Sequence, residues 1–179
     1  MDWQKQYEAG ETPWDRGTAA PALVDFLTRC GGMTGDVLVP GCGTGSDLIP
    51  IAQAGATSVL GLDIAPLAVQ RAGEKLAGIP SARVIESDLF VAAHGELAGR
   101  FDWVWEHTCF CAIPLELRVA YVAAVAAALR PGGKLAGVFF INPWDENEDQ
   151  TQGPPFGCSP EALIESFAPH FDIEESYRP

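Results

Sequence analysis

The chain has 179 residues, of which 47% are hydrophobic and 20% are charged, so it is large enough for one ordinary hydrophobic core. Eleven basic against 24 acidic residues give a formal net charge of −13, and this balance excludes a basic surface for nucleic acid or anionic membranes. No apolar run approaches the roughly 18 residues of a membrane span, and the N-terminus has no signal-peptide pattern. We therefore predict a soluble cytoplasmic protein that binds small molecules, with a monomer as the favoured oligomeric state.

The five cysteines are odd in number and show no disulfide-framework spacing; they are Cys30, Cys42, Cys109, Cys111 and Cys158. Cys109 and Cys111 are separated by one residue, but no second Cys or His pair stands at zinc-ligand spacing. We expect reduced thiols and no metal, and Cys109 or Cys111 can still line a site by position.

The N-terminal half alternates between helical and extended patterns after a first segment, residues 1–20, that is rich in Trp, Gln, Glu and Gly. In chain order, we predict a helix over Pro21–Cys30, a strand over Val37–Val39, a helix over Ser46–Ala54, a strand over Ser58–Asp63 and a helix over Pro66–Leu76. Gly and Pro residues close each helix, as they commonly do.

The C-terminal half continues the alternation. The predicted elements are strands over Ala82–Glu86 and Phe101–Glu106, a helix over Leu115–Leu129, a strand over Lys134–Ile141, a loop over Asn142–Cys158, a helix begun by Ser159 as N-cap and Pro160, and a sixth strand over Phe171–Ser176. Alternating strands and helices predict βαβ units and a mostly parallel α/β sheet. No linker divides the chain, so we predict one domain over residues 1–179.

The first predicted strand runs into a glycine loop with Gly41, Gly43 and Gly45, and a helix follows. Glycines in this position let backbone N–H groups approach a ligand closely, and they accept turn dihedrals that other residues resist. Asp63 stands at the carboxyl end of the second strand, where a carboxylate can accept hydrogen bonds from both hydroxyls of a ribose. The two features together predict a nucleoside cofactor.

Two cofactors use this arrangement. A nicotinamide enzyme prefers G-x-G-x-x-G/A, whereas Ser46 occupies the sixth position here. The pattern G-x-G-x-G suits a cofactor without a pyrophosphate, whose amino-acid tail lies against the loop, and S-adenosylmethionine is such a cofactor. Past the third strand, Asp88 can accept from the exocyclic amine of an adenine and Leu89 can pack on its ring. A nicotinamide-dependent oxidoreductase therefore remains only a remote alternative.

Several segments resemble the thiopurine S-methyltransferase family, and most closely its halide, thiocyanate and thiol methyltransferase branch. They follow one another in the order expected for that family along nearly the whole chain: Gly10–Asp15, Val37–Leu48, Gly61–Val69, Glu106–Ile113, Leu129–Gly133 and Gly153–Phe156. The resemblance implies a class I methyltransferase fold, which is a Rossmann-like three-layer sandwich with a mostly parallel sheet. Relatives usually continue past the sixth strand into a final edge strand, whereas this sequence ends at Pro179; that strand is missing, shortened or outside the given sequence, so the last edge of the sheet is in doubt.

The resemblance also implies roles for individual residues. Residues 1–20 would fold over S-adenosylmethionine as a lid, with aromatic faces toward the sulfonium and Trp14 also near the acceptor. The implied cofactor-binding set is Trp3, Tyr7, Trp14, Gly41, Cys42, Gly43, Gly45, Asp63, Ile64, Asp88, Leu89 and Glu106. The implied catalytic set is Trp14, His107, Thr108 and Arg118.

Three of the catalytic candidates also have a structural interpretation, and Trp14 could be a surface-lid or core residue. His107 could deprotonate a thiol or orient a water, or it could be a structural hydrogen-bonding residue. Thr108 and nearby N–H groups could hold a small anion. Arg118 falls where the family has an arginine near the acceptor, but it could instead pair with Glu116 on a helix surface.

We predict transfer of a methyl group to a small soft nucleophile such as a halide, thiocyanate or hydrosulfide, by in-line displacement. The alternative is S-methylation of a bulkier thiol, such as a thiopurine or an aryl thiol. A domain that binds the cofactor without activity is a third possibility, which the aromatic lid disfavours.

Overall fold

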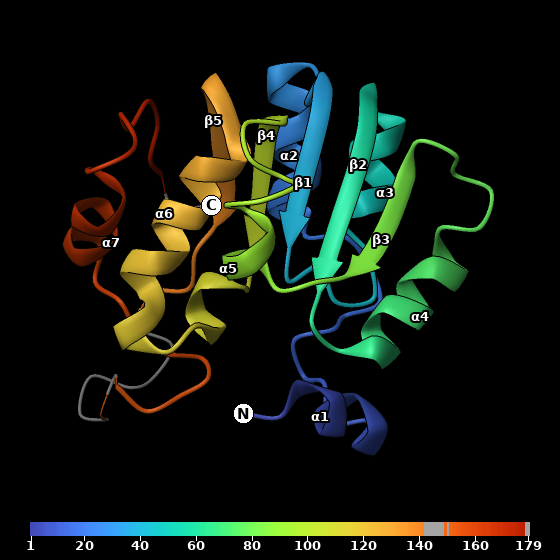
Figure 1. The fold of residues 1–179 in the computed structure, drawn as a ribbon, viewed down its shortest axis with the longest axis horizontal. Coiled ribbons are helices and arrows are strands. Elements are labelled where there is room, and N and C mark those ends of the chain that lie inside the picture. Colours follow the sequence, from blue (N-terminus) through green and yellow to red (C-terminus); the bar gives the residue numbers. More distant parts are fainter. Residues whose placement is uncertain (142–148, 150, 178–179) are drawn as a thin grey trace.

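The computed structural model describes residues 1–141, 149 and 151–177, and these contain a five-stranded parallel sheet. The strand order is β3-β2-β1-β4-β5, as Figure 1 shows. The strands are β1 (Gly35–Pro40), β2 (Ala56–Asp63), β3 (Ala82–Glu86), β4 (Phe101–His107) and β5 (Leu129–Val138). The predicted parallel α/β fold is therefore confirmed.

Helices connect the strands and cover the sheet. They are α1 (Trp3–Ala9), α2 (Pro21–Cys30), α3 (Leu48–Gln53), α4 (Pro66–Lys75), α5 (Leu89–Ala92), α6 (Arg118–Ala128) and α7 (Pro160–Phe167), with 3-10 turns η1 (Phe110–Ala112) and η2 (Leu115–Leu117). Ser159 caps α7 as predicted, because its side chain accepts the backbone N–H of Ala162. None of the helices in the described ranges is long and apolar enough to cross a membrane.

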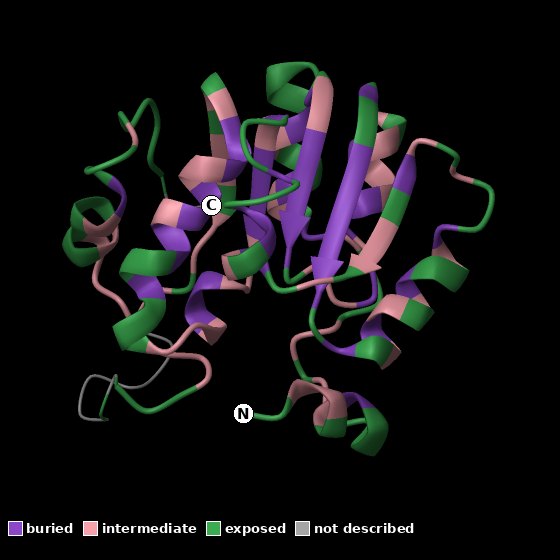
Figure 2. Ribbon diagram, in the orientation of Figure 1, coloured by how far each residue is buried: buried purple, intermediate pink, exposed green. Residues whose placement is uncertain are grey.

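The sheet is covered on both faces, so the fold has three layers. Successive strand residues point to opposite faces: Leu38 and Leu60 pack toward α5, α6 and α7, while Val37 and Val59 pack toward α2 and α3. Figure 2 shows that burial is deepest along the central strands β1, β2 and β4. Their near-continuous apolar runs reflect burial on both faces.

The strand order reverses direction at β1, which lies between β2 and β4. Loops leaving the carboxyl ends of these strands diverge, and this divergence opens a crevice where α/β proteins bind ligands. Helix α1 lies beyond these carboxyl ends and beside α4 (Figure 1). Two side chains hold it there: Gln4 accepts the N–H of Leu67 at 2.9 Å, and Arg71 donates to the carbonyl of Tyr7 at 3.3 Å.

The helix predicted over Leu115–Leu129 is shorter and ends at Ala128. Leu129 is extended and pairs with Phe101 of β4, because Arg130 precedes Pro131 and that position disfavours helix. The pairing is interrupted after Leu129 and resumes at Lys134, where the fifth strand was predicted to begin. That strand ends at Val138 rather than at Ile141.

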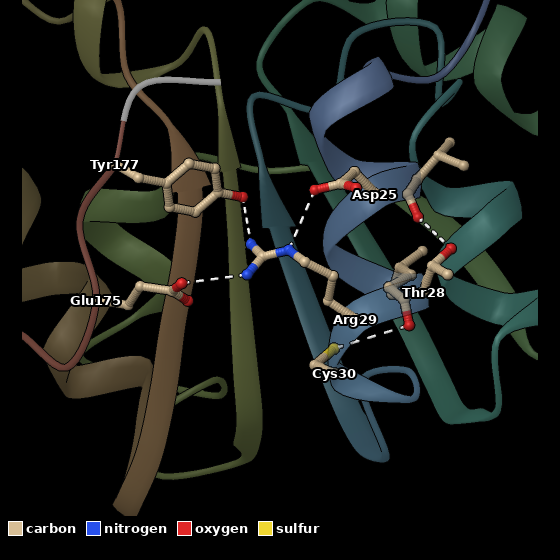
Figure 3. A network of polar contacts seen from close by, with 8 residues as sticks. Asp25, Thr28, Arg29, Cys30, Glu175 and Tyr177 are labelled. Atoms are coloured by element: carbon tan, nitrogen blue, oxygen red, sulfur yellow. Dashed lines mark hydrogen bonds and ion pairs between the residues drawn. The ribbon is translucent and has the colours of Figure 1, made fainter.

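The sixth strand predicted over Phe171–Ser176 is wrong, since residues 171–177 are irregular. A strand needs a neighbour for its backbone N–H and C=O groups, and none of the strands in the described ranges pairs with this segment. Side chains hold it instead. Glu174 accepts from Lys134 of β5 at 2.9 Å, and Arg29 of α2 contacts both Glu175, at 3.1 Å, and Tyr177 (Figure 3).

Of the loop predicted over Asn142–Cys158, residues 142–148 and 150 lie outside the described residues. Residue 149 and residues 151–158 contain no helix or strand, as predicted.

Candidate active site

A cavity of about 520 Å³ lies at the carboxyl ends of the strands, a size typical of small-molecule sites. Its walls come from the N-terminal segment, the glycine loop, and the segments that follow β2, β3 and β4. Because Asp63 ends β2 and Asp88 follows β3, they lie on one side of β1. His107 ends β4 and residues 108–113 follow it, so they lie on the other side. The cavity therefore has two ends with different lining.

The glycine loop lies close to both the N-terminal segment and the turn that follows β4. Gly41 and Gly43 have φ of +59° and +53°, a conformation that L residues rarely adopt. A Cβ on Gly41 would lie 2.8 Å from Sγ of Cys109, and one on Gly43 would lie 3.0 Å from Oη of Tyr7. Gly45 faces Ala72 of α4 and does not line the cavity.

Asp63 ends β2 and is anchored by two backbone groups. Its Oδ2 accepts the N–H of Gly43, and its Oδ1 accepts the N–H of Ala65, both at 2.9 Å. Burial raises its pKa, against the opposing effect of these hydrogen bonds. Each carboxylate oxygen has two lone pairs, so both oxygens can still accept a hydroxyl. This geometry fits the two hydroxyls of a ribose.

The segment after β3 offers a polar and an apolar group side by side. Asp88 caps α5 by accepting the N–H of Phe90 on Oδ1 at 2.8 Å, which leaves Oδ2 available to a ligand amine. Leu89 is buried, and Ile64 is exposed; both line the cavity. These residues fit an adenine ring between apolar surfaces.

Three aromatic side chains of the N-terminal segment cover the cavity. The ring centroid of Trp14 lies 5.3 Å from that of Trp3 and 6.0 Å from that of Tyr7, both in edge-to-face geometry. The indole N–H of Trp14 donates to Oη of Tyr7 at 3.3 Å. Burial raises the pKa of Tyr7 to about 12, so its hydroxyl stays neutral. A sulfonium held against such faces is stabilised by their quadrupoles.

A polar network that the sequence analysis missed ties this segment to the glycine loop. Thr44 donates to Asp15 at 2.8 Å, and Lys75 of α4 donates to Thr44 at 3.0 Å and to Ser46 at 2.8 Å. The network joins three segments that are distant in sequence. No local pattern signalled it, because each member is an ordinary loop or helix-surface residue on its own.

A second missed residue is Asp47, the N-cap position of α3, which is buried beside β4. Its Oδ2 accepts the indole N–H of Trp105 at 2.8 Å and contacts Nδ1 of His107 at 2.9 Å. Its Oδ1 accepts the N–H of Ala20 at 2.8 Å. An acid directly after the glycine loop was the available signal, since β4 runs beside β1 and ends near that loop.

The turn after β4 forms the floor of the other end. Thr108 has φ +62°, a strained conformation for a β-branched residue that is typical of functional sites. Glu106 is fully buried, and its Oε1 accepts the N–H groups of Cys109 and Phe110 at 2.8 and 2.7 Å. Burial raises the pKa of Glu106 to about 7. Glu106 therefore shapes the turn from behind and does not line the cavity.

Arg118 lies outside the cavity lining. It packs over the ring of Phe110 at 4.4 Å and donates to the carbonyls of Gly157 and Phe156 at 3.0 and 2.9 Å. Neither approach to the cavity nor a pair with Glu116 is seen. Its contacts instead hold the segment that continues from Pro154 and Pro155, which do line the cavity.

The structure thus gathers most of the predicted site residues around one cavity. Those lining it are Trp3, Tyr7, Trp14, Gly41, Cys42, Gly43, Asp63, Ile64, Asp88, Leu89, His107 and Thr108, while Gly45, Glu106 and Arg118 stand behind its walls. The role of each residue stays a prediction.

Comparison with known proteins identifies the family. The family model described as Thiopurine S-methyltransferase matches residues 1–179. Probable thiol methyltransferase 2 of Arabidopsis thaliana is 36% identical over 88% of this chain, and Thiocyanate methyltransferase 1 of Brassica oleracea is 34% identical over 86%. The matched parts span about two thirds of these plant proteins, 67% and 66% of their lengths.

A solved structure agrees with this assignment. Its description reads "Conversion of a Disulfide Bond into a Thioacetal Group during Echinomycin Biosynthesis". It superposes with a TM-score of 0.77 at 28% identity and covers 91% of this chain and 72% of its own. The chain belongs to the thiopurine S-methyltransferase family of S-adenosylmethionine-dependent class I methyltransferases.

Proposed function

We propose that the protein methylates a small, soft nucleophile such as iodide, bromide, thiocyanate or hydrosulfide. The observation that carries this proposal is the character of the cavity beyond β4. Apart from His107, Thr108 and Tyr121, its lining is apolar or only weakly polar and includes Cys109, Cys111, Ala112, Ile113, Phe140, Pro154 and Pro155. Large, weakly hydrated anions lose less hydration free energy on entering such a site than small, strongly hydrated ones do. The thiol and thiocyanate methyltransferases that resemble this chain support the same substrate class.

The other end of the cavity fits the methyl donor. We assign the ribose to Asp63, the adenine to Asp88 and Leu89, and the sulfonium to Trp3, Tyr7 and Trp14. When bound, S-adenosylmethionine supplies an electrophilic methyl group. The residues of this chain hold acceptor and methyl group in line and exclude water. An acceptor that arrives as an anion requires no proton transfer.

A second candidate is S-methylation of a bulkier thiol such as a thiopurine or an aryl thiol. The specific observation in its favour is the cavity volume of about 520 Å³, together with the family model that matches the whole chain. In this case Arg118 would have an indirect role. It holds the segment that contains Phe156 and Gly157, and the position of this segment would set the width of the acceptor end of the cavity.

The test is a substrate panel with S-adenosylmethionine. Purified protein is incubated separately with iodide, thiocyanate, hydrosulfide and an aryl thiol. Methyl products are measured by headspace gas chromatography, and S-adenosylhomocysteine is measured in solution. We expect methyl iodide and methyl thiocyanate, each formed together with an equal amount of S-adenosylhomocysteine. The Asp63→Ala variant serves as the control for binding at the assigned cofactor site.

Methylation of the aryl thiol without any methyl halide or methyl thiocyanate would replace the first candidate by the second. Absence of S-adenosylhomocysteine with every acceptor would overturn both.

A further inference from the structure

The carboxylate of Asp47 is surrounded by hydrogen-bond donors. It accepts from the backbone of Ala20 and from the indole of Trp105, and it contacts Nδ1 of His107 at 2.9 Å. Only 9% of the Asp47 side chain is exposed. Burial alone would raise the pKa of Asp47, but these hydrogen bonds outweigh burial and lower it. Asp47 is therefore ionised near neutral pH, where its carboxylate can only accept hydrogen bonds.

This arrangement fixes the imidazole of His107. Because Asp47 accepts only, Nδ1 must carry the hydrogen, and in the neutral ring Nε2 then has the free lone pair. The buried edge of the ring faces Asp47, whereas 28% of the side chain is exposed and the residue lines the cavity. The basic nitrogen is therefore on the edge that is open to the cavity.

The surroundings also set the basicity of His107. Burial lowers its pKa, but the hydrogen bond and charge of Asp47 and the charge of Glu106 outweigh burial and raise it above 6.5. The charged groups that act on the ring are Asp47 before α3 and Glu106 on β4. Asp15, Arg16, Asp63 and Asp88 also line the cavity. A general base works best when its pKa lies near the working pH.

We propose that His107, positioned by Asp47, is the general base that lets this cavity methylate thiols that arrive protonated. The S–H bond breaks and its proton passes to Nε2, while a sulfur lone pair forms the new S–CH₃ bond. The electron pair of the broken methyl–sulfonium bond remains on the donor's sulfur. The imidazolium then loses its proton to water. This inference rests on the proposed function and adds neutral alkyl thiols to its acceptors.

The decisive comparison sets an acceptor that needs a base against two acceptors that do not. An alkyl thiol such as 2-mercaptoethanol is protonated near neutral pH, whereas 4-nitrothiophenol and thiocyanate are already anions. For His107→Gln we expect kcat/KM to fall about 10²-fold with the alkyl thiol, the low end of what a positioned base contributes. With both anionic acceptors, kcat/KM should change by less than about threefold, and exogenous imidazole should restore part of the alkyl-thiol rate.

The pH profile tests the role of Asp47 as a positioning residue. For the wild type, kcat/KM with the alkyl thiol should rise with pH as His107 becomes neutral. Asp47→Asn removes the charge that raises the pKa of His107. The rise should therefore move to lower pH and reach a lower plateau, while thiocyanate turnover keeps its flat profile.

Several outcomes would overturn the inference. An equal loss with all three acceptors, together with weaker S-adenosylhomocysteine binding by calorimetry, would mean that His107 holds the cofactor's carboxylate. Unchanged rates would mean that His107 is only structural. Both results differ from failure of the proposed function, in which the wild type itself would methylate neither thiol nor anion.

Discussion

Asp63 shows how one residue serves both the fold and the site. Its carboxylate joins the glycine loop to the start of α4 through the N–H groups of Gly43 and Ala65. Asp63 also lines the cavity, where a ribose would add two more hydrogen bonds. Loss of this side chain should therefore affect cofactor binding directly, and the loop only secondarily.

Asp63→Ala should weaken S-adenosylhomocysteine binding by about 1.5–3 kcal/mol, the range for hydrogen bonds to a charged group. Isothermal titration calorimetry measures the change. Glu86→Ala is the matched control, because Glu86 pairs with Asp63 in the register of β2 and β3 but is exposed and outside the cavity lining. Equal affinity of Asp63→Ala and wild type would place the ribose elsewhere.

Glu106 makes stability depend on pH. Its pKa is about 7 in the folded chain, against 4.5 for an unperturbed glutamate, because burial disfavours the charged form. The folded state therefore binds this proton more tightly, and its contribution to stability is lost as pH rises from about 4.5 to about 7. At about 1.4 kcal/mol for each pKa unit, the loss is on the order of 3 kcal/mol.

Urea denaturation at about pH 5 and about pH 8 tests this contribution. Wild type should lose more unfolding free energy between these values than Glu106→Gln, which cannot titrate. The difference between the two proteins isolates Glu106 from His107, whose pKa is also raised. Parallel losses in both proteins would assign the pH dependence to other groups.

At the scale of elements, most of the sheet could be predicted because buried parallel strands leave strong local patterns. The segment Ala82–Glu86 was predicted with its observed bounds, and the helix from Pro21 begins and ends as expected. The sixth strand could not be judged locally, because alternation in residues 171–176 does not reveal whether a neighbouring strand exists. Tertiary pairing decides that question.

The site residues also fall into two groups, those that local sequence patterns predict and those that only tertiary contacts reveal. Motif glycines and Asp63 could be found because their chemistry depends on spacing along the chain. Asp47 and the Asp15–Thr44–Lys75 network depend on which loops meet after folding, and Arg118 faces carbonyls that lie almost 40 positions away. A sequence pattern does not reveal such contacts directly, and for Asp47 its place after the glycine loop was the one signal available.

The N-terminal element is joined to the rest of the site by side chains of both kinds, polar and aromatic. Trp14 packs on Trp3 and Tyr7, while Asp15 beside it bonds to Thr44 of the glycine loop. Trp14 is only partly buried, so it contributes more to the cavity than to the core.

Trp14→Ala should lower kcat/KM by about tenfold, because a cation–π contact in a desolvated site is worth about 1–2 kcal/mol. The thermal unfolding midpoint should change little. Trp103→Ala is a control with the opposite expected result. Trp103 packs on Phe26 and does not line the cavity. Its loss should lower the unfolding midpoint and leave kcat/KM unchanged. If Trp14→Ala instead destabilised the fold as much as Trp103→Ala, Trp14 would be a core residue.

For the whole molecule, the net charge of −13 opposes the approach of an anionic acceptor. This repulsion acts at long range, and salt screens it beyond a Debye length of about 10 Å at 0.1 M. For iodide or thiocyanate, kcat/KM should therefore rise with ionic strength, by about twofold to fivefold, which is less than the roughly tenfold effect of strong electrostatic steering. A neutral alkyl thiol, measured in the same buffers with an added salt that is not a substrate, should show no such rise. A fall in kcat/KM with salt for the anions alone would mean that local cations such as Arg16 and a protonated His107 dominate the field at the cavity mouth.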